Sequence, residues 1–349
     1  MRLTRKDLDL AVDQGVLDAS RAEGLWEFLL QRNAQRPQFD LQHLLYYFGA
    51  LLVMGAMGWF MNESWERFGG LGLLLIALAY AGAFASVGWW LWTKAGYRAP
   101  GGLLVTLAVW MTPLAIYGLE VLTGIWPQDV PGAFAKYHVL VRGGWLLMEA
   151  GTVLAGLLAL RFFRFPFLTF PVAFALWYMS MDLTPLLLGR EDFSWDERKL
   201  VSVCFGLVVL AATYVVDRRT REDFAFWGYL FGLMAFWGGL SVMESHSELG
   251  KLAYCGVNVG LLLVSILVQR RVFLVFGSLG VAGYLGHLAW DVFKDSLAFP
   301  FVLSLIGLLA IAAGVQYRRH GAALERAVLA MLPDRLRRGL PQYRRGSGD

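Results

Sequence analysis

The residues of this chain that could do chemistry are ionisable side chains inside long apolar runs. Glu149 lies deepest, more than one helical turn inside its run, and Glu120 and Asp182 occupy neighbouring runs. His287 and Asp291 are spaced i, i+4, which places both on one face of a helix. Because a charge in hydrocarbon is costly, these five residues predict a site that binds a substrate or an ion, or that relays protons.

Plainer roles remain open for the same residues. The three acids nearest the ends of their runs can be hydrated by water and headgroups. His287 suits a hydrogen-bonded packing role as well as a ligand role. Glu149 has two candidate partners, His287 and Asn258, and as an alternative it extends toward Arg142, two turns earlier on the same face.

The sequence contains no motif that assigns a reaction or a cofactor. Nucleophile elbows, HExxH, Walker A and dinucleotide-binding glycine patterns are all absent. Gly280, Gly283 and Gly286 lie inside an apolar run and indicate a helix-packing face. Cys204 and Cys255 stand apart without a metal-ligand spacing. We therefore predict no catalytic residue, no metal and no cofactor, and the sequence gives no support for an enzyme.

The amino-acid composition indicates the class of protein in which these ionisable residues lie. The chain has 349 residues, of which 57% are hydrophobic and only 17% are charged. Its mean hydropathy is +0.52. Soluble domains carry about 25% charged residues, and disordered, collagen-like or disulfide-scaffold chains do not carry this apolar content. The sequence predicts an integral membrane protein.

Apolar runs of membrane-spanning length occur ten times, which predicts an all-α, polytopic transmembrane helical bundle. The predicted spans are 42–61, 70–92, 101–123, 143–160, 165–188, 199–216, 224–243, 250–268, 272–293 and 297–317. The fifth run contains Pro166, Pro171 and Pro185, which would bend or shorten its helix.

The distribution of basic residues predicts the orientation of these spans. With a cytoplasmic N-terminus, the inner segments hold 23 of the 31 Lys and Arg residues. This bias is typical of cytoplasmic loops, and both termini then face the cytoplasm. The outer loops are acidic, which predicts an outward-facing acidic surface. The predicted location is the bacterial inner membrane.

The N-terminal residues 1–41 form a separate predicted unit, a cytoplasmic helical hairpin. Gly15 ends the first helix, and Ser20 with Glu23 forms the capping-box pattern of the second. Each helix has an apolar stripe, but the shared core is too small for independent stability. We expect the hairpin to pack on the membrane domain, on a second copy of the chain, or on a protein partner.

The C-terminal residues 318–349 follow the membrane domain of residues 42–317 as a basic tail. Residues 320–338 combine apolar positions at helical spacing with flanking arginines. Such a segment beside a membrane helix is expected to lie on anionic lipids of the inner leaflet. Since the positive-inside bias already explains these charges, we predict no nucleic-acid partner.

Two short segments, Asp13–Ala22 in the hairpin and Phe48–Leu52 in the first span, resemble the DUF2157 family of uncharacterised bacterial membrane proteins. Asp13–Ala22 is similar to that family's turn into the second hairpin helix. Phe48–Leu52, followed by Asn62-Glu63-Ser64-Trp65, resembles its Gly-rich first span and polar-Trp exit, although the family often has Asn directly before Trp. The resemblance covers about the first 70 residues and implies a bacterial inner-membrane protein without a defined activity.

Together these features favour a membrane protein that binds or transports a small solute or lipid through an outward-facing acidic cavity. The alternative is a non-transporting scaffold or sensor that acts through its cytoplasmic hairpin.

Overall fold

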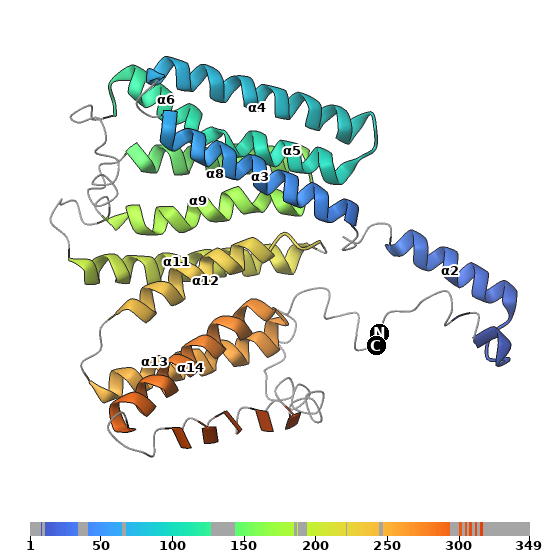
Figure 1. Ribbon diagram of the computed structural model, residues 1–349, viewed down its shortest axis with the longest axis vertical. Helices are drawn as coiled ribbons and strands as arrows, with labels where there is room; N and C mark the ends of the chain where they lie inside the picture. Colours follow the sequence, from blue (N-terminus) through green and yellow to red (C-terminus); the bar gives the residue numbers. More distant parts are fainter. Residues whose placement is uncertain are drawn as a thin grey trace. The chain divides into compact units, whose positions relative to one another are not determined.

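The computed structural model describes the helical parts of the chain. The described residues are 8, 11–33, 41–64, 68–126, 144–184, 187, 194–220, 222–243, 247–293 and scattered positions between 300 and 316. Every element within them is helical (Figure 1). The C-terminal tail and residues 127–142 of the predicted outer loop between the third and fourth spans lie outside the described residues.

The helices follow the predicted apolar runs closely. Their bounds are α2 Ala19–Asn33, α3 Leu41–Ser64, α4 Gly69–Thr93, α5 Arg98–Trp110, α6 Thr112–Thr123, α8 Gly144–Phe162, α9 Thr169–Asp182, α11 Trp195–Arg219, α12 Phe226–Val242, α13 Glu248–Val268 and α14 Arg271–Phe293. The helical class is therefore confirmed for the part of the chain that the structure describes.

Several helices have the length and apolar composition needed to cross a membrane. Five described segments meet both conditions: Gly69–Thr93, Arg98–Thr123, Trp145–Phe162, Trp195–Arg219 and Leu249–Val268. Leu44–Phe60 and Phe226–Val242 are apolar but shorter. The structure is thus compatible with a membrane protein, and the count of ten spans stays a prediction.

Two of the predicted spans are interrupted. The run 101–123 divides into α5 and α6 at Met111, because Pro113 occupies the first turn of α6 and has no N–H to continue α5. The run 165–188 begins with the short 3-10 helix Pro166–Leu168 before α9. Proline at the start of each helix explains both breaks.

The chain divides into two compact units, residues 1–58 and 59–349. In the first unit, Gly15 adopts a positive φ of 69° in the turn before α2. The predicted capping box is wrong, because α2 begins at Ala19 and Ser20 therefore lies inside its first turn. One hollow is lined both by Leu8 and Val12, which precede the turn, and by Trp26 of α2. The complete hairpin stays a prediction.

In the second unit, helices pack mainly on their neighbours in sequence. α4 contacts α5 and α6, α6 contacts α8, and α8 contacts α9. α9 contacts both α11 and α12, and α13 pairs with α14 (Figure 1). Gly206 allows a close approach of two backbones, since a Cβ there would lie 2.5 Å from the Phe236 backbone nitrogen. Small residues therefore bring α11 and α12 into backbone contact.

The exposed faces of these helices are apolar. Leu154 is 69% exposed and Val208 is 65% exposed. Buried positions meanwhile include acids and amides such as Glu120, Asp217 and Asn258. This distribution suits a hydrocarbon environment, where lipid tails cover apolar side chains and polar groups turn toward the protein interior.

Candidate functional site

Glu149 lies in the first third of α8 and is only 6% exposed. The residues of α8 on either side of Glu149 are mostly apolar, so the helix forms without a polar partner for the Glu149 side chain. Neither carboxylate oxygen of Glu149 has a hydrogen-bond partner among the described residues. The buried carboxyl group must therefore be neutralised or paired in another way.

The partner of Glu149 is a second acid, Asp182, at the last residue of α9. The two carboxyl groups are close enough to interact electrostatically. Tyr178, one turn earlier on α9, interacts electrostatically with both. Two ionised carboxylates repel each other at short range, so a proton or a cation on one of them stabilises the pair.

Arg198 provides the positive charge of this cluster. Its Nη2 lies 3.7 Å from Oδ1 of Asp182, and the two side chains are 12% and 11% exposed. Its Nε also donates a hydrogen bond to the Met181 carbonyl oxygen at 3.2 Å. The side chain is thereby held against the C-terminal end of α9, where a cation is favoured.

A capping box fixes the position of Arg198. The Ser194 hydroxyl accepts from the Glu197 amide at 3.2 Å, and Oε2 of Glu197 accepts from the Ser194 amide at 2.8 Å. α11 therefore starts at Trp195, and Arg198 lies in its first turn with its guanidinium over the Trp195 ring at 5.4 Å. The sequence interpretation treated Arg198 as a loop residue and missed its role.

The charges of the cluster define its chemistry. Glu149 and Asp182 contribute two carboxyl groups, and Arg198 contributes one guanidinium. With both carboxyl groups ionised, the cluster has one negative charge in excess. A single proton or a single monovalent cation makes the cluster neutral, which removes the cost of burying a net charge.

The other candidate residues do not join this pair. Glu120, 2% exposed on α6, has both carboxylate oxygens without a hydrogen-bond partner among the described residues and interacts electrostatically with Tyr117. His287 is exposed on α14, and the side chain of Asp291 lies outside the described residues. The structure therefore brings together two of the five predicted site residues.

Asn258, one of the proposed partners of Glu149, is occupied elsewhere. Its Oδ1 accepts from Nε1 of Trp237 at 2.9 Å, and its amide nitrogen donates to the Tyr254 carbonyl oxygen at 2.8 Å. The prediction that it bonds Glu149 is wrong, because α13 packs with α14 rather than with α8.

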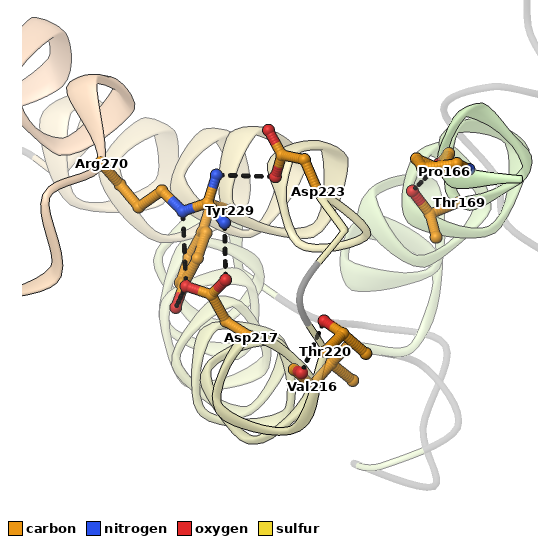
Figure 2. Close-up of polar contacts among 8 residues, drawn as sticks. All are labelled: Pro166, Thr169, Val216, Asp217, Thr220, Asp223, Tyr229 and Arg270. Atoms are coloured by element: carbon orange, nitrogen blue, oxygen red, sulfur yellow. Dashed lines mark hydrogen bonds and ion pairs between the residues drawn. The ribbon is translucent and has the colours of Figure 1, made fainter. Parts of the chain in front are cut away.

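A second polar cluster was missed by the sequence interpretation (Figure 2). Asp217, 1% exposed at the end of α11, accepts from Nη2 of Arg270 at 2.5 Å and from the Tyr229 hydroxyl at 3.1 Å. Arg270 also donates to Asp223 at 2.6 Å. This network ties α11 and α12 to the turn between α13 and α14, so its role is structural.

Within the described residues, no group of three or more His, Cys, Asp or Glu side chains could hold a metal ion. Comparisons of the chain with protein families, curated proteins and solved structures gave no match.

Proposed function

We propose that this chain is a multi-pass inner-membrane protein that binds a small cation at the Glu149–Asp182 pair in exchange for a proton. The observation that carries the proposal is the electrostatic interaction between the buried Glu149 and the largely buried Asp182 on the adjacent helix, beside Arg198. Carboxyl groups inside membrane helices are rare and mark ion or proton pathways.

The charge of the cluster favours a monovalent cation. A divalent ion would leave a positive excess beside Arg198, whereas a proton or monovalent ion gives a neutral cluster. Access is from the Asp182 side, since Asp182 and Arg198 retain some exposure while Glu149 is almost fully buried.

The orientation of the site follows from the distribution of basic residues. Under the ten-span topology with both termini in the cytoplasm, the start of α8 and the end of α9 face outward. The pair then lies in the outward half of the membrane, below the acidic outer loops. We infer that the cation arrives from that side.

Flux measurements in proteoliposomes test the proposal. Vesicles carry a pH-sensitive dye inside, and NaCl, KCl or choline chloride is added outside. We expect Na⁺ or K⁺, but not choline, to make the interior more alkaline as protons leave. Glu149→Gln should abolish the signal, because an amide cannot release the proton.

Glu120→Gln is the matched control. It also changes a buried acid whose oxygens have no partner among the described residues, but it lies outside the pair. It should retain flux at the wild-type rate. Equal loss in both variants, or an unchanged rate in Glu149→Gln, would overturn the proposal and favour the scaffold alternative.

A further inference from the structure

A groove runs along the same helices, with its charged mouth at the end opposite the carboxyl pair. It has a volume of about 960 Å³ and is bordered by α8, α9 and α11. Its floor includes Val172, Ala173 and Val209, which are buried, and its rim includes the exposed Leu157 and Val208. The volume is at the upper end of the range typical of ligand pockets.

The charged residues of the groove are confined to one end. Arg164 follows α8, Arg219 ends α11, and Glu222 lies in the turn after α11, all at the groove mouth. Both arginines are exposed, and neither forms an ion pair with the residues that the structure describes. With Glu222 included, the mouth keeps one positive charge in excess.

The polar groups at the mouth are otherwise satisfied. The Thr169 hydroxyl donates to the Pro166 carbonyl oxygen at 2.7 Å, and the Thr220 hydroxyl donates to the Val216 carbonyl oxygen at 3.0 Å (Figure 2). These bonds close the helix ends, so that among the described residues of the mouth the two guanidinium groups are the donors without a protein acceptor. An anionic group is the ligand that they would bind.

The length of the groove matches one leaflet. Along α9 it extends from Thr169 to Met179, about 15 Å at 1.5 Å per residue, which is about half of a 30 Å hydrocarbon core. The mouth belongs to the loops that the positive-inside bias assigns to the cytoplasm. An acyl chain would follow the apolar walls, and its headgroup would reach the arginines.

We propose that this groove binds an anionic phospholipid of the inner leaflet, with its phosphate at Arg164 and Arg219. The chain of the lipid lies between α8 and α11 on the floor formed by α9. Glu222 accepts a hydrogen bond from a headgroup hydroxyl, as phosphatidylglycerol would supply. This site is independent of cation exchange at the carboxyl pair.

Native mass spectrometry of the delipidated full-length protein tests the site, with phosphatidylglycerol and phosphatidylcholine as probes. We expect a preference for phosphatidylglycerol that is lost in Arg164→Gln/Arg219→Gln. Two lost contacts of about 1 kcal/mol each correspond to about thirtyfold weaker binding. Arg161→Gln/Arg218→Gln removes the same charge from exposed positions outside the groove and should bind as wild type does.

A second pair of variants tests the position of the acyl chain. Ala212 lines the groove, whereas the adjacent exposed Ala211 does not. Ala212→Phe should fill the groove and reduce phosphatidylglycerol binding, while Ala211→Phe should not. Equal binding of the two lipids, or equal effects within either pair of variants, would overturn the proposal.

Discussion

Replacing Arg270 by methionine gives the sharpest stability test of the fold. Arg270 lies in the turn between α13 and α14, after Gln269 with a positive φ of 56°. Its Nε and Nη2 donate to the Asp217 carboxylate at 3.3 and 2.5 Å. Because Asp217 is 1% exposed, losing the guanidinium leaves a buried carboxylate whose remaining donor is the Tyr229 hydroxyl.

The expected loss follows from this burial. Breaking a buried ion pair by removing one partner costs about 3–5 kcal/mol, and Arg270→Met should lower the free energy of unfolding by that amount. Asp223, the other acid on Arg270, is 55% exposed. Asp223→Asn is therefore the matched control and should cost about 0–1 kcal/mol.

A double variant separates charge from packing. Asp217→Asn/Arg270→Met removes both charges and retains an acceptor for the Tyr229 hydroxyl. We expect it to be more stable than Arg270→Met alone, since no unpaired charge remains buried. Denaturant titration in detergent, followed by tryptophan fluorescence, gives these free energies. An Arg270→Met loss no greater than the Asp223→Asn loss would refute the reasoning.

Three further substitutions have defined expectations in thermal unfolding. Glu120→Met removes a buried carboxyl group without a hydrogen-bond partner among the described residues and should stabilise the protein by about 1–3 kcal/mol; a lower midpoint would contradict this. Gly280→Ala should destabilise by about 1–3 kcal/mol, because its Cβ would overlap the Asn258 side chain, whereas Gly283→Ala has open space and should be neutral. Ser194→Ala removes the cap of α11 and should cost about 1 kcal/mol; an unchanged midpoint would show that the cap is dispensable.

The positions of the helices were predictable because each apolar run specifies its own helix. α4, α11 and α13 begin and end within a few residues of the predicted spans. The break at Met111 was missed, although Pro113 supplies a local signal for it. Local sequence therefore accounts for helix position.

The partners within the candidate site were not predictable in the same way. The burial of Glu149 was expected from its depth, but its pairing with Asp182 depends on how α8 and α9 pack. Asp217 was missed because it follows the last residue of its predicted span, where hydration is the ordinary expectation. Arg270, which buries it, is 53 residues away in sequence. Such contacts arise from tertiary packing, and the residues next to each side chain in the sequence do not reveal its partner.

The most direct test of the central claim is the number of protons released when a cation binds. A pH-indicator dye in weakly buffered detergent solution reports release as NaCl or KCl is added, with choline chloride correcting for ionic strength. If the Glu149–Asp182 pair exchanges a proton for a cation, the wild type releases about one proton per bound ion and Glu120→Gln does the same. Glu149→Gln should release none. Cation binding without proton release in the wild type, or undiminished release in Glu149→Gln, would contradict the account.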